Sequence, residues 1–112
     1  MTLADYFSTG PAMEKPIFDA VMAHLDTLGP VHVEPVSVGI FLKNPRKFAE
    51  LRPMQRWVAI WFPLRRLAHH RTIVRKVVPY GGWYYHVANV TGPDDVDDDL
   101  AALLIEAYEE RD

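Results

Sequence analysis

The sequence predicts an α+β fold of two layers, in which an N-terminal and a C-terminal helix pack on a mainly antiparallel sheet of about five strands. Apolar residues recur at three- and four-residue spacing near both ends of the chain, which is the period of an amphipathic helix. Between the helices, short alternating runs are joined by turn residues, without the helical crossovers that parallel strands need. An isolated β-barrel is the weaker alternative, because the helices would then have little to pack against.

Length and composition indicate one domain over residues 1–112. With 49% apolar residues, a chain of this size can form a core; it buries roughly 65% of its unfolded surface. The absence of cysteine excludes a disulfide framework, thiolate metal sites and a thiol nucleophile. Neither a long apolar run nor a signal-peptide pattern is seen, so we expect a cytoplasmic protein with no membrane partner.

Two helices are expected before the sheet. Thr2 can cap a short helix that runs to Phe7. Pro16 suits the first position of a longer helix, which Gly29 and Pro30 end. The apolar stripe of this longer helix consists of Ile17, Phe18, Val21, Met22, Leu25 and Leu28.

The period changes to two after this helix. Alternation over residues 31–42 predicts two strands with a kink or turn near Pro35, and Asn44-Pro45 marks the next turn. Residues 46–52 are expected to form a basic connection anchored by Phe48 and Leu51.

A third strand is predicted over residues 55–62. It is apolar on both faces, which is typical of a central strand. Pro63 is expected to end it, and residues 64–71 to form a basic loop.

Residues 73–90 predict a β-hairpin. A β-branched run and an aromatic run flank Gly81-Gly82, and two glycines can adopt the positive φ of a tight turn. The expected pairs are Tyr80 with Trp83, Val78 with Tyr85, Lys76 with Val87 and Val74 with Asn89.

A last helix follows Thr91-Gly92-Pro93. We expect Asp94 or Asp95 to cap it, while the neighbouring aspartates offset the positive end of its dipole. These aspartates lack the spacing of a calcium-binding loop. The apolar stripe of the helix is Val96, Leu100, Leu103, Leu104, Ala107 and Tyr108.

The strands carry more aromatic side chains than one buried face can hold. Both faces of the predicted hairpin bear aromatic residues, whereas the helices cover only one face of the sheet. Some of Tyr80, Trp83, Tyr84 and Tyr85 should therefore reach solvent or a partner.

Charge is distributed unevenly along the chain. Residues 40–80 carry ten bases, seven of them arginines, and one acid, Glu50. Residues 94–112 carry nine acids and one base, Arg111. The basic block is consistent with a solvated surface balanced by the acidic helix, with a site for an anion or nucleic acid, or with recognition of an acidic protein. The overall pI of about 5.9 counts against a dedicated nucleic-acid binder.

The sequence assigns no catalytic residue, metal or cofactor. His24, His32, His69, His70 and His86 show no metal-ligand spacing, and a cation would be repelled by the basic loop that holds the adjacent pair. A nucleophile elbow, a Cys/His pair and a cofactor fingerprint are all missing.

Five segments in order resemble a known family. They are Asp5-Tyr6-Phe7 followed by Pro16, Leu28-Gly29-Pro30-Val31, Arg46 to Pro53, Val78 to His86, and Asp94 to Tyr108. In this order and spacing they resemble the bacterial family known as domain of unknown function 5655, over nearly the whole chain. The resemblance implies a compact bacterial domain, found alone or attached to larger proteins, with no established activity, ligand or catalytic residue.

We therefore expect a non-enzymatic binding module whose basic, aromatic sheet and loop region contacts an anionic ligand, a nucleic acid or an acidic protein. The alternative is a small-molecule-binding domain or small enzyme with a pocket around His86 and neighbouring tyrosines. His86 alone is explained more simply as a half-buried residue bonded to a tyrosine or a carbonyl. A homodimer is left open. The expected binding surface consists of Arg65, Arg66, Arg71, Arg75, Tyr84 and His86.

Overall fold

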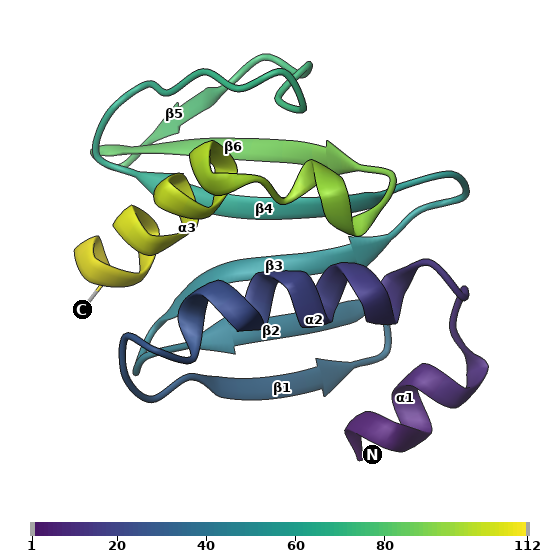
Figure 1. Ribbon diagram of the computed structural model, residues 1–112. Helices are drawn as coiled ribbons and strands as arrows, with labels where there is room; N and C mark the ends of the chain where they lie inside the picture. The colour runs from purple at the N-terminus through teal and green to yellow at the C-terminus, as the bar shows by residue number, and fades with distance from the viewer. Residues whose placement is uncertain (1, 112) are drawn as a thin grey trace.

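A computed structural model describes residues 2–111 and shows a six-stranded sheet with helices on one side (Figure 1). The strands lie in the order β1-β2-β3-β4-β6-β5, and each neighbouring pair is antiparallel. This confirms the predicted α+β class, with six strands where about five were expected. The strands are β1 (His32–Val36), β2 (Gly39–Lys43), β3 (Lys47–Pro53), β4 (Val58–Leu64), β5 (Val78–Tyr80) and β6 (Trp83–Val90). The helices are α1 (Leu3–Thr9), α2 (Glu14–Leu25) and α3 (Asp98–Glu110), with a 3-10 turn η1 (Pro93–Asp95) before α3.

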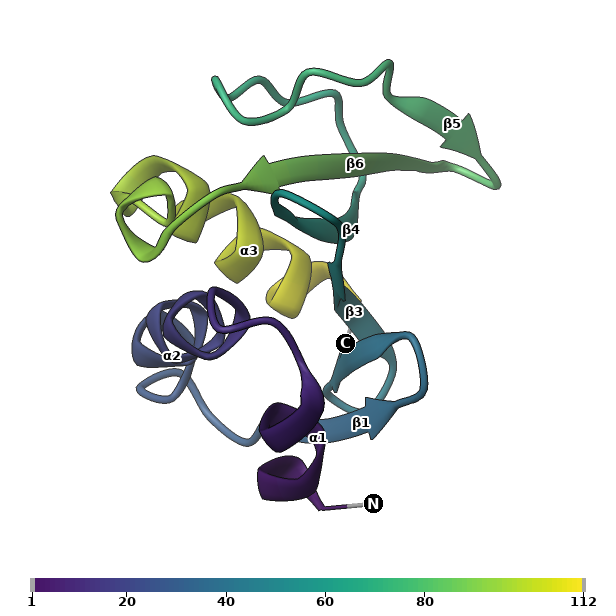
Figure 2. The same ribbon diagram turned by 90° about the vertical axis from the view of Figure 1, so that its right-hand side faces the viewer.

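The two faces of the sheet differ. Seen edge-on, α2 and α3 lie together on one side, and no helix within residues 2–111 lies on the other (Figure 2). We call these the covered face and the open face. The core fills the space between the covered face and the helices, because alternate strand residues and the apolar helix stripes meet there. Sheet residues fully buried in it include Ile40, Leu42, Leu51, Ile60, Phe62 and Leu64.

The N-terminal helices form nearly as predicted. The Thr2 hydroxyl accepts a hydrogen bond from the Asp5 amide, and this confirms the cap of α1, which continues to Thr9. The longer helix, α2, begins at Glu14, two residues before the expected start at Pro16, and ends at Leu25. Leu28 was wrongly included in its stripe, because this residue lies beyond the helix and is exposed.

The first turn of the sheet lies two residues beyond the expected position. Pro35 is inside β1, opposite Ile40, and residues 37–38 form the turn instead. Since β1 is an edge strand, its proline need not donate to a second neighbour. Gly39 follows the turn and packs so closely on the Leu51 carbonyl that a Cβ atom would overlap it.

The predicted connection over residues 46–52 was wrong, because this segment is β3. A register shift between Leu42 and Lys43 interrupts the alternation, and Phe48 and Ala49 are both buried although they are consecutive. Such a bulge removes the period-two signal that identifies a strand. The expected stop at Pro63 was also wrong: β4 is central as predicted, but it continues to Leu64.

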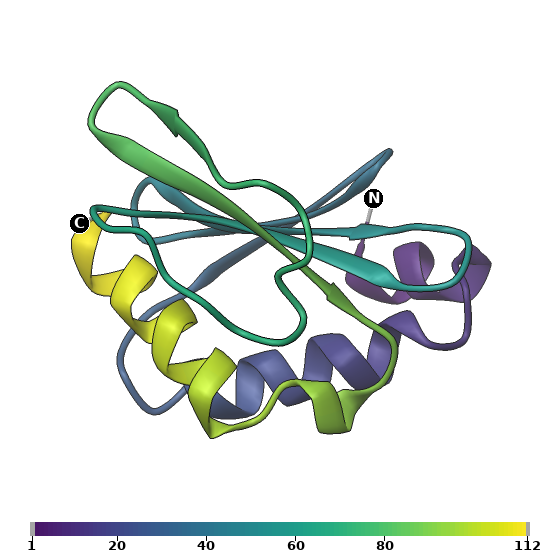
Figure 3. The ribbon, with the colours of Figure 1, turned by 90° about the horizontal axis from the view of Figure 1, so that it is seen from above.

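The hairpin turn is confirmed. Gly81 and Gly82 have φ values of 61° and 84°, and Tyr80 pairs with Trp83 as expected. Pairing also joins Val78 to Tyr85 and stops there, so the predicted pairs of Lys76 with Val87 and of Val74 with Asn89 were wrong. Viewed from above, the hairpin projects from the sheet on the side away from the helices (Figure 3).

The loop over residues 65–77 is held elsewhere, which explains the shorter hairpin. Its anchors are His70, which bonds Asp97, and Arg71, which bonds Asp95, and both aspartates lie just before α3. The helix cap is Asp97, which accepts from the Leu100 amide, and the prediction of Asp94 or Asp95 was wrong because both belong to η1. All six residues of the predicted stripe of this helix are buried.

Candidate binding surface

The open face displays aromatic side chains from two adjacent strands. Strand register places Trp61 of β4 on the side opposite the buried Ile60 and Phe62. The same alternation in β6 places Trp83 and Tyr85 on the open face. All three rings are partly exposed, and Tyr80 in β5 is 76% exposed. The structure thus shows where the predicted surplus of aromatic residues lies.

Arginines lie over both tryptophans. The guanidinium groups of Arg75 and Arg52 lie 5.1 Å and 5.9 Å from the centre of the Trp61 ring. Those of Arg65 and Arg111 lie 3.8 Å and 4.8 Å from the centre of the Trp83 ring. A planar guanidinium on an aromatic face keeps its N–H groups free for an anion.

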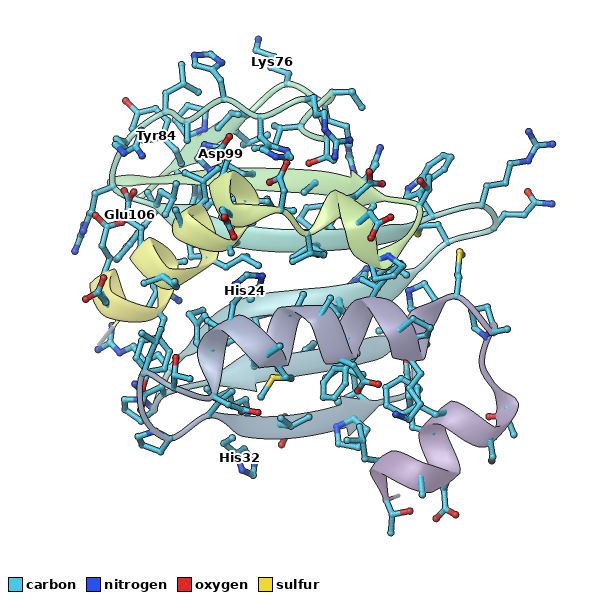
Figure 4. The ribbon with its side chains drawn as sticks, in the orientation of Figure 1. His24, His32, Lys76, Tyr84, Asp99 and Glu106 are labelled. Atoms are coloured by element: carbon cyan, nitrogen blue, oxygen red, sulfur yellow. The ribbon has the colours of Figure 1, made fainter. Side chains whose placement is uncertain are left out.

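Some of the bases beside these rings form no ion pair with the described residues. Within residues 2–111, Arg65, Arg75 and Lys76 have no carboxylate oxygen within ion-pair distance. Lys76 lies at the outer edge of the molecule, in the loop beside β5 (Figure 4). Glu110 of α3 accepts a hydrogen bond from the Arg65 amide, but no ion pair within the described residues neutralises the side chains of these three bases.

Two hollows meet at Trp61 and Tyr85. The first has a volume of about 290 Å³ and lies towards β3. The second, of about 270 Å³, lies towards β5 and is lined by Arg75, Lys76 and Tyr80 as well as by the two shared aromatic residues. Both combine aromatic walls with basic side chains, which suits a planar, negatively charged ligand.

The six residues expected to form the binding surface do not converge. Arg65 and Arg75 reach the open face. Arg66 instead makes two 2.9 Å hydrogen bonds to Glu106 of α3, and Arg71 bonds Asp95 at 2.9 Å. Glu106 projects from α3 on the helix side (Figure 4). The acidic C-terminal region thus neutralises half of the four arginines.

His86 lies in the core and not at a surface. Its side chain is fully buried, stacks on Phe62 and accepts a 3.0 Å hydrogen bond from the Ala68 amide at Nε2. Burial lowers the pKa of His86, so the imidazole is neutral at pH 7 with its proton on Nδ1. This histidine holds the loop against β6. Tyr84, two residues earlier, points to the same covered side at its margin.

A cluster that the sequence did not reveal joins the loop to α3. His70 Nδ1 lies 2.7 Å from the Thr72 hydroxyl, and His70 Nε2 lies 2.9 Å from Asp97 Oδ1. Carboxylate, imidazole and hydroxyl in this order resemble an acid–base relay. Thr72 is only 5% exposed, however, and it does not line the hollow beside His70 and Asp97, so the relay acts as a tether.

Two other residues of the open face were missed by the sequence. Arg111 belongs to the acidic C-terminal segment, and only the fold brings it to Trp83, with Nε bonded to the Lys47 carbonyl. Glu50 is the lone acid of the basic block, and that isolation was the available signal. It contacts Lys47 and Arg52 on the open face.

Comparisons with known proteins identify a family but no activity. Neither a curated protein nor a solved structure matches the chain. Residues 2–111 contain no group of three or more metal-ligating side chains placed to hold an ion, and no helix there is long and apolar enough to cross a membrane. One family model, described as domain of unknown function (DUF5655), matches residues 3–111, so the chain belongs to that family.

Proposed function

We propose that this domain is a binding module whose open face binds single-stranded nucleic acid. The observation that carries the proposal is the pair of tryptophans on an uncovered antiparallel sheet, each flanked by arginines, with Arg65 and Arg75 unpaired by carboxylates within residues 2–111. Aromatic rings stack on bases, and arginines contact the phosphates between them.

The same features favour a single strand over a duplex. In a duplex the bases are stacked on one another, so aromatic side chains on a sheet cannot reach their faces. Duplex readers generally insert a helix or a ribbon into a groove. Here the helices lie on the other side of the sheet, and α3 with its flanking turn is acidic, which repels phosphates.

An acidic protein is the competing partner. Arginines bind carboxylates as readily as phosphates, so charge alone does not separate the two partners. The aromatic rings decide the preference, because nucleobases present planar faces that acidic side chains lack.

The test compares two double variants with equal charge. Arg65→Ala/Arg75→Ala removes the open-face arginines, and Arg66→Ala/Arg71→Ala removes their neighbours that are paired with carboxylates. Fluorescence anisotropy with a labelled oligonucleotide of about 12 nucleotides measures affinity across a salt series. We expect the first variant to bind roughly tenfold more weakly, with a salt slope reduced by about 0.7 for each phosphate that is no longer neutralised. The control should retain native affinity and slope.

Three results would contradict the proposal. Equal reductions of affinity in both variants would mean that binding follows net charge and not the open face. Tighter binding to duplex than to single strand would exclude base stacking. Binding to polyglutamate, with none to the oligonucleotide, would favour an acidic protein partner. Circular dichroism of each variant verifies that the fold is intact.

A further inference from the structure

Glu50 is the one acidic residue among ten bases in residues 40–80, and it lies on the open face. Its neighbours in sequence, Ala49 and Leu51, are buried on the covered face, so alternation directs Glu50 outward. Although no helix within residues 2–111 covers this face, Glu50 is only 6% exposed. Because Glu50 is almost completely buried within a basic surface, contact with solvent does not explain the presence of a carboxylate at this position.

Glu50 lines the 290 Å³ hollow at the point where two strands separate. The register of β3 with β4 begins at the pair Glu50–Trp61, and beyond it β3 curves away from β4 (Figure 1). Pro63, which has no amide hydrogen to donate, lies in β4 within this opening. Apart from Arg111, the residues that line the hollow belong to β3, β4 and β6, so the hollow is built mainly from the sheet.

The carboxylate retains hydrogen-bonding capacity. Lys47 Nζ lies 2.8 Å from Oε1, and Arg52 Nε bonds Oε2. Burial alone would raise the pKa of Glu50, but these two bonds outweigh burial and lower it, so the group is ionised at pH 7. An ionised carboxylate has about four acceptor positions, so each oxygen can accept a further hydrogen bond.

The walls and rim of the hollow suit the rest of a nucleotide. Trp61 and Tyr85 supply aromatic surface, and Lys47 and Arg111 supply positive charge. The hollow thus combines a paired acceptor, planar apolar surface and cations within about 290 Å³, which is enough room for one base.

We propose that this hollow selects guanine, whose N1–H and 2-amino group donate in parallel to the two oxygens of Glu50 while its ring packs against Trp61 or Tyr85. The inference rests on the proposed function and gives the open face a base preference. Of the common bases, guanine alone has two adjacent donors on its Watson–Crick edge. Adenine and cytosine present a single amino group beside an acceptor, which would face a carboxylate oxygen unfavourably.

The sharpest test varies the base and leaves the protein unchanged. Oligouridylates of about seven nucleotides carry one central guanosine, inosine, adenosine or cytidine, and anisotropy measures each affinity. We expect the guanosine strand to bind about tenfold more tightly than the others. Inosine is the critical probe, because it keeps N1–H and lacks the 2-amino group, so it should lose most of the preference.

Two variants of the protein complete the test. Glu50→Gln should abolish the difference between guanosine and inosine, because an amide cannot accept two hydrogen bonds from one base edge. Glu34→Gln is the matched control, since Glu34 is also paired with a lysine on the open face but does not line the hollow. It should keep the preference. Guanosine monophosphate tested alone shows whether the ligand can be a free nucleotide.

The outcomes separate this inference from the proposed function. Equal binding of all four strands would overturn guanine selection and leave single-strand binding intact. Retention of the guanosine preference by Glu50→Gln would overturn the role of Glu50. Failure of every strand and of guanosine monophosphate to bind would overturn both proposals.

Discussion

The covered and open faces of the sheet each enclose one glutamate, and the pKa values of the two are shifted in opposite directions. Glu14, on the helix side, is fully buried, and Glu50, on the open face, is 6% exposed. Burial raises the pKa of Glu14, and a 2.6 Å hydrogen bond from the Tyr6 hydroxyl lowers it only in part. For Glu50, burial also acts to raise the pKa, but Lys47 and Arg52 lower it overall.

The difference lies in the charges that the chain places near each carboxylate. Residues 1–39 contain a single base, Lys15, and it pairs with Asp19. Within residues 2–111, Glu14 forms no ion pair that would stabilise its ionised form, and its Oε1 has no hydrogen-bond partner there. Glu50 lies in the basic block and has two cations. Comparable burial thus gives a carboxyl group that holds its proton more strongly on one face and an ionised acceptor on the other.

The largest expected effect is a loss of stability caused by a substitution in α3, one of the helices that pack on the covered face. Leu104 of α3 is 1% exposed and belongs to the core cluster, so Leu104→Ala should lower the free energy of unfolding by about 2–5 kcal/mol. Glu109→Ala, on the exposed side of the same helix, should change it by less than about 0.5 kcal/mol. Urea denaturation measures both. Similar small reductions would mean that α3 is not needed to close the core.

The next effect concerns the turn that directs aromatic residues to the open face. Gly82 has a φ of 84°, which a β-branched side chain rarely adopts, so Gly82→Val should cost about 1–3 kcal/mol. Gly92→Ala is the control, because Gly92 is extended and an added Cβ meets no atom within 4 Å. Thermal melts followed by circular dichroism compare the two. An unchanged melting temperature in Gly82→Val would contradict the assignment of the turn to Gly81-Gly82.

The sequence predicted the elements whose signal is local. The stripe of α3, the glycine turn and the central position of β4 all follow from spacing and turn chemistry, and each is found in the structure. The predicted stripe of α2 extended too far, to Leu28. The same reasoning failed to predict β3, because a bulge interrupts the alternation there and Phe48 and Ala49 are both buried. The loop over residues 65–77 was mistaken in part for a strand because its anchors, His70 and Arg71, depend on distant partners.

The candidate site was less predictable than the fold. Arg65 and Arg66 are adjacent in sequence, yet one lies over Trp83 and the other bonds Glu106. Neither composition nor periodicity distinguishes the two arginines, because their roles depend on the face of the sheet towards which each side chain points after the end of β4. Arg111 reaches the open face only through the packing of α3. The residue types thus indicated the chemistry of the surface, whereas the tertiary structure determines which residues form it.

The smallest expected effect is a difference in pH dependence between the two glutamates. Folded Glu14 retains its proton above pH 4.5, where the unfolded chain has lost it, so the native protein loses stability as pH rises from 4.5 through the raised pKa. Glu14→Gln should become progressively more stable relative to native across that window, because glutamine keeps the hydrogen bond from Tyr6.

Folded Glu50 has a pKa below that of the unfolded chain, so its contribution to stability is present above pH 4.5 and is lost as pH falls below it. Glu50→Gln should therefore be less stable than native at neutral pH, by no more than about 1 kcal/mol because Lys47 and Arg52 are solvent-exposed, and this deficit should shrink in acid. Urea unfolding at intervals between about pH 3.5 and 8 gives both difference curves, and curves of the same slope would contradict the opposite environments of the two carboxylates.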